Sequence, residues 1–347
     1  MTDESIRCRN CGRKNIIKRG KRKTKYGNRQ LYWCKSCSRY FVDSSLNNKT
    51  YGPKVIANAM NMYNQGNTLE DSARHTNRKY KVKISKSSVH DWLKEYSGIF
   101  TYNRIRPKAL KTYGKDIIFA KTYEHNGLDY DFRYHIPKVE FLCTDTFPGL
   151  KSYVTGFENS CPKFFNDIDN RCSQMKIDIS FRKQGKYNNA CRLANFALKT
   201  CRNNRERHPT VENMMLINDS STIACEVPIW LWEKNLNAGI NGHIDVLQVR
   251  NGLVYILDFK PDAFKEKAEK VASQLFFYAS GLSFRTGIKL DKFRCAWFDE
   301  TVYYEFDPSS AKVRFPKPYE TADYKLLIPE GKAADFVSEV RYTFRKN

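Results

Sequence analysis

The residues best suited to chemistry lie in two short motifs, Gly242-His-Ile-Asp245 and Asp258-Phe-Lys260. Between them, two apolar runs flank an Asn251-Gly252 pair, a combination that predicts a β-hairpin. Asp245 and Asp258 would then lie on neighbouring strands. Because side chains alternate along a strand, Asp258 and Lys260 would share one face. The sequence therefore predicts that two carboxylates and one ammonium group meet at a single place.

Such a group of side chains suits one kind of reaction. Paired carboxylates provide the oxygen ligands that Mg²⁺ or Mn²⁺ prefers, and a nearby lysine can orient a water or stabilise charge on a phosphate oxygen. An Asp-x-Lys triplet also occurs on exposed strands with no function. Here Ile256, Leu257 and Phe259 predict a buried strand, where unpaired charges are costly. The set indicates metal-assisted hydrolysis of a phosphodiester.

The order of these motifs resembles the PD-(D/E)xK nuclease superfamily, especially its RecB/Cas4-type branch. That branch carries a Q-x-x-x-Y helix after the D-x-K strand, and Gln274-Leu-Phe-Phe-Tyr278 occupies this place on a helix expected over Phe264–Ser280. The two side chains, four residues apart, would be neighbours on one helical face. Three upstream segments also resemble the branch: Cys161-Pro-Lys-Phe-Phe165, Arg207-His208-Pro-Thr-Val-Glu212 and Cys225-Glu226-Val-Pro228.

The resemblance spans residues 150–310 and implies an α/β restriction-endonuclease-like core with a mixed central sheet. It implies magnesium or manganese ligands at His208, Glu212, Asp245 and Asp258, with the carbonyl oxygen of Phe259 as a further ligand. It also implies catalytic roles for Asp245, Asp258, Lys260, Glu226, Gln274 and Tyr278. Which of His208, Glu212 and Glu226 complete the metal site stays open, since a histidine beside a proline is often an ordinary surface residue.

Two cysteine pairs near the N-terminus predict a structural metal site. Cys8-Arg-Asn-Cys11 and Cys34-Lys-Ser-Cys37 are separated by 22 residues, and four thiolates in two close pairs can form a closed tetrahedral Zn²⁺ shell. We therefore expect a small zinc ribbon over residues 1–48. Because all four positions are filled by protein, this site leaves no room for a substrate.

The remaining cysteines suggest a reducing compartment and no second cluster. The chain holds 11 cysteines and no secretory signal, which favours metal binding over disulfides. Relatives such as Cas4 hold an iron–sulfur cluster, but that pattern needs cysteines beyond Tyr278, where only Cys295 lies. We expect buried thiols instead at Cys161, Cys172, Cys191 and Cys201.

The expected ribbon is strongly basic, and so is the whole chain, with a formal net charge of +23. Such a field attracts a polyanion, most simply DNA, although a ribosomal or membrane-surface role would also tolerate it. Within the ribbon, the densest run is Lys18-Arg19-Gly20-Lys21-Arg22-Lys23. A run of this kind can be merely solvated. Its place on a zinc module, among aromatic residues, favours contact between Lys18, Arg19, Lys21, Arg22, Lys23 and the phosphate backbone.

Three short helices are expected over residues 49–100. The first begins at Pro53, the second covers Leu69–His75, and the third runs through Val89 to Tyr96 after a basic connector, Thr76–Ser85. This order predicts a helix-turn-helix, whose third helix would present Ser88, His90 and Lys94 to a major groove. The long connector puts close helix packing in doubt, and a plain three-helix domain is the alternative.

The ribbon and helices together, over residues 5–98, resemble the N-terminal DNA-binding part of prokaryotic and archaeal insertion-sequence transposases. The resemblance is carried by Tyr32-Trp-Cys-Lys-Ser-Cys37, Arg39-Tyr-Phe-Val42 and Ser88-Val-His-Asp-Trp-Leu93. A catalytic domain with a DDE triad follows in those transposases. No convincing DDE triad is found here, and the D-x-K set takes its place.

Residues 101–150 are expected to form either a connecting region or the first part of the nuclease sheet. Short strands are expected at Ile117–Ala120, Phe132–Tyr134 and Val139–Cys143. In the nuclease-like domain, residues 151–347, we expect helices over Lys186–Arg207 and Ala333–Arg345, and strands near Phe293–Trp297 and Val302–Phe306.

The sequence thus predicts a multidomain, metal-dependent DNA nuclease, most simply an endonuclease. No apolar run approaches the length of a membrane span, so we expect an intracellular, cytoplasmic chain of prokaryotic or archaeal type with DNA as its partner and no membrane contact. Cutting both strands would favour a homodimer. The alternatives are a non-catalytic DNA-binding regulator and a transposase-like recombinase.

Overall fold

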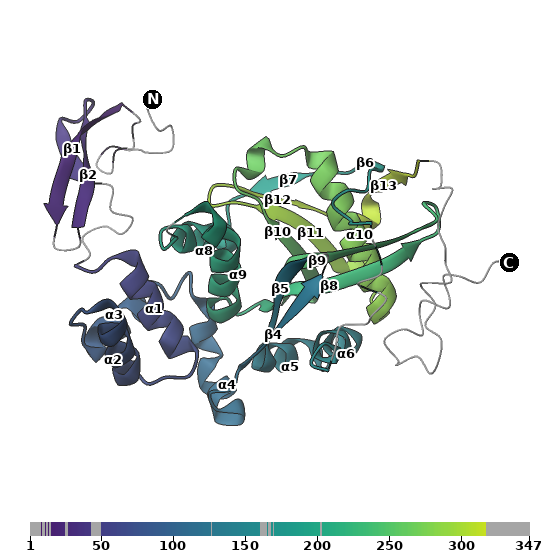
Figure 1. The fold of residues 1–347 in the computed structure, drawn as a ribbon, viewed down its shortest axis with the longest axis horizontal. Coiled ribbons are helices and arrows are strands. Elements are labelled where there is room, and N and C mark those ends of the chain that lie inside the picture. The colour runs from purple at the N-terminus through teal and green to yellow at the C-terminus, as the bar shows by residue number, and fades with distance from the viewer. Residues whose placement is uncertain are drawn as a thin grey trace.

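The structure is a computed structural model that describes residues 8, 11, 13, 15–24, 27–42, 50–125, 127–159, 165, 168, 170–201 and 203–316. Within these residues the chain forms three sheets and a set of helices (Figure 1). The largest is a mixed sheet of eight strands. The helix expected over Ala333–Arg345 lies outside the described residues, as do the first four residues of the Cys161–Phe165 segment.

The first sheet is a small antiparallel one, in the order β1 (Ile16–Thr24), β2 (Gly27–Cys34) and β3 (Arg39–Val42). In Figure 1, β1 and β2 stand apart from the eight-stranded sheet. Its buried apolar cluster is limited to Cys8, Tyr32, Cys34 and Phe41. A core this small cannot hold a fold alone, so the unit needs an additional cross-link.

Three helices follow: α1 (Pro53–Asn64), α2 (Leu69–Tyr80) and α3 (Lys86–Glu95). Side-chain caps begin two of them, because Thr68 Oγ1 accepts from Asp71 N at 3.0 Å and Ser85 Oγ accepts from Ser88 N at 3.2 Å. However, α2 continues five residues beyond the expected end. The basic residues of its last turn suit a helix C-terminus, and Lys81, with φ 52°, ends it.

The expected long connector between α2 and α3 is therefore wrong. It is a short segment, residues 81–85, and the Asn77 side chain braces it. Asn77 Nδ2 donates to the Ile84 carbonyl at 2.9 Å, and Ile84 N donates to Asn77 Oδ1 at 2.7 Å. The long connector was the reason to doubt close packing of these helices. Because the connector is short and α2 and α3 are in contact, that doubt is removed.

The three helices pack against the body of the molecule. The ring of Phe196, on α8 (Asn189–Leu198), makes edge contacts with Tyr96 and Phe100 at centroid distances of 5.2 and 5.1 Å. Asn64 Nδ2 donates at 2.8 Å to Asn218 Oδ1, at the end of α9 (Arg207–Asn218). The single helix expected over Lys186–Arg207 is wrong, because α8 begins at its Asn188 cap and ends at Leu198.

The large sheet is the centre of the fold. Its strands, in spatial order, are β4 (Ile118–His125), β5 (Leu128–His135), β8 (Thr222–Glu233), β9 (Ala238–Arg250), β10 (Leu253–Phe259), β11 (Phe293–Phe298), β12 (Tyr303–Phe306) and β7 (Gln184–Lys186). Neighbours are antiparallel except β10 and β11, which are parallel. A parallel pair needs a crossover, here α10 (Ala268–Thr286).

The expected hairpin is confirmed. Leu253 pairs with Arg250 across the turn, and Asn251 and Gly252 have φ of 54° and 67°. Two consecutive positive φ values are the signature of the tight turn that matches strand twist. The hairpin fixes the register of every later pair between β9 and β10, including the two acids.

The sheet begins before residue 151. Strand β5 pairs with β8 at Arg133↔Cys225, so the β4–β5 hairpin is the first part of the sheet, the second of the two expectations for this region. The strand expected at Val139–Cys143 is wrong, because these residues belong to helix α5 (Ile136–Cys143). Pro137 lies in its first turn, which favours a helix start, and Val139 and Cys143, one turn apart, are both buried.

Helices cover both faces of the sheet, as Figure 1 shows for α8, α9 and α10. On one face α8 and α9 pack with Leu257 and Phe259. On the other, α5, α6 (Pro148–Gly156) and α10 pack with Ile256 and Trp297. Burial on both faces explains why β10 is continuously apolar up to Asp258.

Shorter elements complete the described chain: η1 (Thr101–Arg104), α4 (Arg106–Tyr113), η2 (Asn204–Glu206), η3 (Ala263–Lys265), η4 (Leu290–Lys292), η5 (Pro308–Ser310), and a two-stranded sheet of β6 (Asp178–Ser180) and β13 (Lys312–Arg314). Among the described helices, none has both the length and the apolar character needed to cross a lipid bilayer. Cys172, Cys191 and Cys295 are buried, whereas Cys201 is partly exposed.

Candidate functional site

Three acids form a row across three neighbouring strands. The β8–β9 register places Glu226 opposite Asp245, and continuing the β9–β10 register by one residue places Asp258 opposite Asp245. Residues opposite one another in a sheet share a face, with Cβ atoms about 5 Å apart. Two of these acids were expected to meet from the hairpin alone. The sheet adds the third.

The backbone is distorted along this row. Glu226 has φ 52° within strand β8, a conformation that is uncommon for a non-glycine residue. Next to it, Asp245 Oδ2 accepts a hydrogen bond from the Phe259 N–H at 3.1 Å. This bond uses the N–H of Phe259. The role of the Phe259 carbonyl as a metal ligand, which the resemblance implies, stays a prediction. Such distortions collect at functional sites, where surrounding structure holds them.

Lys260 lies beside Asp258, as the spacing predicts. Its Nζ is 2.9 Å from Asp258 Oδ2, and the Asp258 side chain is only 2% exposed. Burial opposes the charge on Lys260, but Asp258 and Asp245 outweigh it and raise the lysine pKa above its ordinary value. Lys260 is therefore an ammonium group at neutral pH, able to donate hydrogen bonds and unable to act as a base.

The pKa values of the two aspartates are shifted in opposite directions. Burial and the charge of Asp245 raise the pKa of Asp258 well above its ordinary range, and Lys260 offsets this only in part. Burial also opposes ionisation of Asp245, yet a hydrogen bond with His208 and the charge of Lys260 leave its pKa lowered. Two buried carboxylates this close resist simultaneous ionisation unless a further positive charge arrives.

Helix α9 brings two more predicted residues to the row. His208 Nδ1 is 3.6 Å from Asp245 Oδ2, with the histidine side chain 42% exposed. Glu212, one turn later, is buried, and its Oε2 is 3.1 Å from Arg133 Nη2. Arg133 comes from β5 and was not expected at the site. It provides the counter-charge for the acids on this side.

Glu212 and Glu226 also influence each other. Burial and then the charges of Glu226 and Asp245 raise the pKa of Glu212 well above its ordinary value. Burial and then Asp245 raise the pKa of Glu226 to about 8. Of the three residues left open by the sequence, Glu226 shares the row, His208 contacts Asp245, and Glu212 is tied to Arg133.

The Q-x-x-x-Y pair lies on α10 as expected. Gln274 Nε2 donates to Tyr278 Oη at 2.9 Å. Burial raises the pKa of Tyr278 well above its ordinary value, so the phenol keeps its proton. Tyr278 faces the same cavity as Asp245 and Glu226.

That cavity has a volume of about 160 Å³. Besides these three predicted residues, it is lined by residues to which the sequence analysis assigned no role: His125, Tyr130, Arg171, Ser173, Asn241, Gly242 and His243. His243 and Gly242 lie inside the Gly-x-x-Asp motif, which could have drawn attention to them. Nothing local marks His125, Tyr130 or Arg171, because distant segments bring them to the site.

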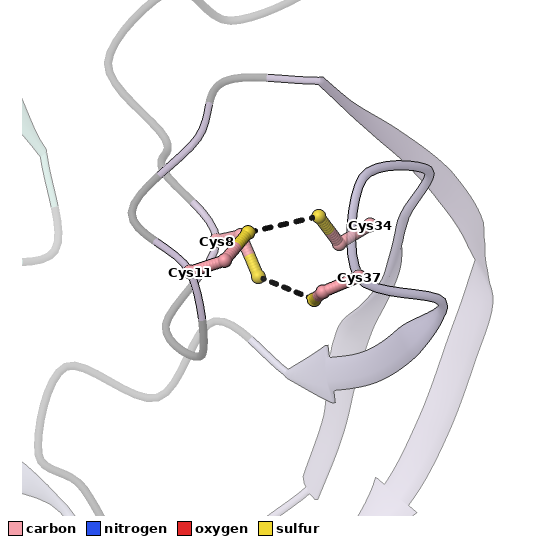
Figure 2. Close-up of side chains that lie close together, drawn as sticks. All are labelled: Cys8, Cys11, Cys34 and Cys37. Atoms are coloured by element: carbon pink, nitrogen blue, oxygen red, sulfur yellow. Dashed lines mark hydrogen bonds between the residues drawn. The ribbon is translucent and has the colours of Figure 1, made fainter.

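The four predicted cysteines lie together (Figure 2). Their Sγ atoms are all within 4.8 Å of one another, with Cys8 and Cys37 3.6 Å apart and Cys11 and Cys34 3.5 Å apart. A tetrahedral Zn²⁺ with bonds of about 2.3 Å requires S–S distances of roughly 3.8 Å, so the group can hold zinc. Burial opposes ionisation of Cys34, but hydrogen bonds from the Cys37 backbone and from Cys8 lower its pKa to about 6.

Among the described residues, these four cysteines are the one group of three or more potential metal ligands whose ligand atoms all lie within 4.8 Å of one another. The carboxylates are spread along the row instead. This difference follows from charge: thiols can lie together neutral, whereas buried acids repel.

The basic residues expected at a DNA surface have different positions. Lys18, Arg19, Lys21, Arg22 and Lys23 are exposed on β1, and His90 and Lys94 are exposed on α3. Ser88 is only half-exposed, and its N–H and hydroxyl both contact the Ser85 hydroxyl at the helix start. Ser88 thus takes part in the cap, and its predicted contact with a major groove stays a prediction.

Comparison of the chain with family models, with curated proteins and with solved structures finds no match.

Proposed function

We propose that this chain is a metal-dependent DNA nuclease with a PD-(D/E)xK-type active site. The observation that carries the proposal is the buried pair Asp245 and Asp258 on one hairpin, with Lys260 Nζ 2.9 Å from Asp258. A fold gains nothing in stability from two buried acids whose pKa values are forced apart. Their placement is better explained by a cation and an anionic substrate that arrive together.

The donor set fits a hard divalent cation such as Mg²⁺ or Mn²⁺. Asp245, Asp258 and Glu226 offer carboxylate oxygens from one row, and His208 and Glu212 lie at its margin. The raised pKa values of Asp258 and Glu226 describe buried acids whose charge Lys260 and Arg133 offset only in part, so the row still lacks positive charge. A bound cation would supply that charge, and it would also stabilise negative charge developing on a phosphate.

The chain's own residues then have distinct tasks. Lys260, held as an ammonium group by the aspartates, donates to a phosphate oxygen and stabilises its charge. Glu226, on the same row as Asp245, can accept a proton from the attacking water when its carboxyl group is ionised. The Tyr278 hydroxyl, oriented by Gln274, donates a hydrogen bond that positions the water or the DNA strand in the cavity.

The N-terminal units would deliver DNA to this site. The cysteine cluster with β1–β3 would be a zinc ribbon, and α1–α3 a helix-turn-helix with His90 and Lys94 toward a major groove. The exposed basic run on β1 and the net charge of +23 support backbone contact. A homodimer would place two active sites on the two strands of a duplex.

Plasmid cleavage tests the proposal directly. The full-length protein is incubated with supercoiled, linear and single-stranded DNA in Mg²⁺, Mn²⁺ or EDTA. We expect metal-dependent cutting that Asp245→Asn and Asp258→Asn each abolish while DNA affinity stays nearly unchanged. Asp262→Asn is the matched control, because Asp262 is exposed, with φ 59°, a conformation asparagine also tolerates.

The outcome separates the proposal from its rivals. Metal-independent binding without cutting of any substrate would indicate a non-catalytic regulator. Joined products in addition to cut ones would indicate a recombinase. Undiminished cutting by either site variant would refute the assignment of these aspartates.

A further inference from the structure

One wall of the cavity combines His243, from the Gly-x-x-Asp motif, with Tyr130 and Arg171, which come from segments with no motif of their own. The ring of Tyr130 stacks on that of His243 at a centroid distance of 3.6 Å and an interplanar angle of 3°. His125 Nδ1 lies 3.1 Å from His243 Nε2, and Asn241 Nδ2 lies 2.9 Å from His125 Nε2. This network makes the wall rigid, so any group that it presents is held in a fixed position.

Arg171 is mounted on this wall by backbone bonds to β9. Cys172 N donates to the Asn241 carbonyl at 2.7 Å, and Asn241 N donates to the Asn170 carbonyl at 2.9 Å. Burial raises the pKa of Tyr130, and the charge of the neighbouring Arg171 guanidinium opposes this rise, so the two side chains lie close together. Within the described part of the chain, no carboxylate forms an ion pair with it. The guanidinium therefore keeps donors for a ligand in the cavity.

The charges of the cavity are arranged in two groups. Glu226 and Asp245 supply carboxyl groups that can hold a cation, and Arg171, among the residues that line the cavity, alone carries a permanent positive charge. His125 and His243 do not add to it, because burial lowers their pKa values to about 4 and about 3. An anion that bridges the two groups must meet a guanidinium on one side and a cation held by the acids on the other.

We propose that Arg171 binds a non-bridging oxygen of the phosphodiester that is cut, with Tyr130 holding the guanidinium in position. The proposal rests on the nuclease function above and adds the residue that recognises its substrate. Arginine suits this task because its planar donors match phosphate oxygens in pairs. No other residue of the predicted set places a permanent cation in this cavity.

The size of the cavity specifies what enters it. A volume of about 160 Å³ corresponds to roughly five water molecules at about 30 Å³ each. A phosphate group with a water fits, but a base pair does not. A contact that Arg171 makes to a phosphate at this site is a contact to the backbone, which carries no sequence information.

The test combines cleavage with binding of a small phosphate probe. Arg171→Gln, Arg171→Lys and Tyr130→Phe are made in the full chain, and Arg182→Gln, at an exposed position away from the cavity, is the matched control. Cleavage is measured on a short duplex in Mg²⁺, and binding of thymidine 3′,5′-bisphosphate by calorimetry. This probe carries phosphates without the polymer contacts of the N-terminal units.

For Arg171→Gln we expect kcat/KM to fall about 10²–10³-fold, the usual loss of one donor to developing charge, and affinity for the bisphosphate to fall at least about tenfold. Arg171→Lys should recover part of both losses, and Tyr130→Phe should lose less than Arg171→Gln. Thermal unfolding midpoints should match the wild type, which distinguishes recognition from a structural role.

The results distinguish this inference from the nuclease proposal. Cleavage by Arg171→Gln within twofold of wild type would overturn the role of Arg171 and leave the nuclease intact. Bisphosphate binding that depends on Arg171, in a wild-type protein that cuts nothing, would support the phosphate site and refute the nuclease. Failure of the wild type both to bind and to cut would overturn both.

Discussion

The aromatic ring of Tyr278 occupies the space that any side chain at position 242 would need. A Cβ atom built on Gly242 would lie 2.6 Å from Tyr278 Cε1 and 2.9 Å from its hydroxyl oxygen. Gly242 and Tyr278 are 36 positions apart in the sequence, and their contact joins the two motifs into one packing unit. The glycine of Gly-x-x-Asp is present because the tyrosine of Q-x-x-x-Y must reach the acid row.

This contact predicts the effect of Gly242→Ala. The added methyl group would displace the Tyr278 ring, and overpacking of this kind typically costs about 1–3 kcal/mol. We expect a lower free energy of unfolding by denaturant and a larger loss of cleavage, since Tyr278 faces the cavity. Gly98→Ala is the control, because its Cβ would meet nothing nearer than 4.0 Å. Equal behaviour of the two variants would contradict the packing argument.

Replacing one zinc ligand should remove the metal and unfold the N-terminal sheet. In Cys34→Ser we expect loss of bound zinc, measured by elemental analysis, and rapid proteolysis before residue 50. The reason is that β1–β3 share only a small apolar cluster, while structural zinc binding contributes about 10–16 kcal/mol in small zinc domains.

Cys201→Ser is the matched cysteine control, because among the described residues its thiol contacts the carbonyls of Ala197 and Glu206, which a hydroxyl can also contact. It should retain zinc. Full zinc content in Cys34→Ser would rule out the four-cysteine site.

Lys138 predicts a pH dependence of stability that is separate from the active site. Its side chain is fully buried, donates to the Leu216 carbonyl and lies 4.9 Å from the ring centre of Tyr102. Burial lowers its pKa from 10.5 to about 7, and Asp219 compensates only in part. Between these pH values the unfolded chain binds the proton that the folded chain has released.

Stability of the wild type should therefore rise with pH from about 7 to about 10.5, relative to Lys138→Met, by at most about 1.4 kcal/mol per pH unit. The difference should be constant below and above that window. Chemical denaturation at several pH values measures it, with Lys111→Met, an exposed lysine on α4, as control. A difference that does not change with pH would mean that Lys138 remains charged in the folded protein.

Local signals in the sequence were sufficient for features that depend on near neighbours. The Asn251-Gly252 turn set the register of β9 and β10 and so brought Asp245 opposite Asp258. Thr68 marked the start of α2, and the cysteine spacing matched the observed cluster. The predicted type or end of a helix was wrong where it depended on more than the local signals at the helix start. This applies to Val139–Cys143 and to the ends of α2 and α8.

The tertiary structure alone decided the surroundings of the acids. Arg133 and Tyr130 come from the β4–β5 hairpin, which pairs with β8 more than 80 residues later, and Arg171 reaches the cavity through its bridge to Asn241. A sequence carries no local trace of such contacts, because burial and proximity to other charges arise only when distant strands pair. The chain by itself therefore specified which residues could perform chemistry. Folding decided how their protons are distributed and which positive charge faces them.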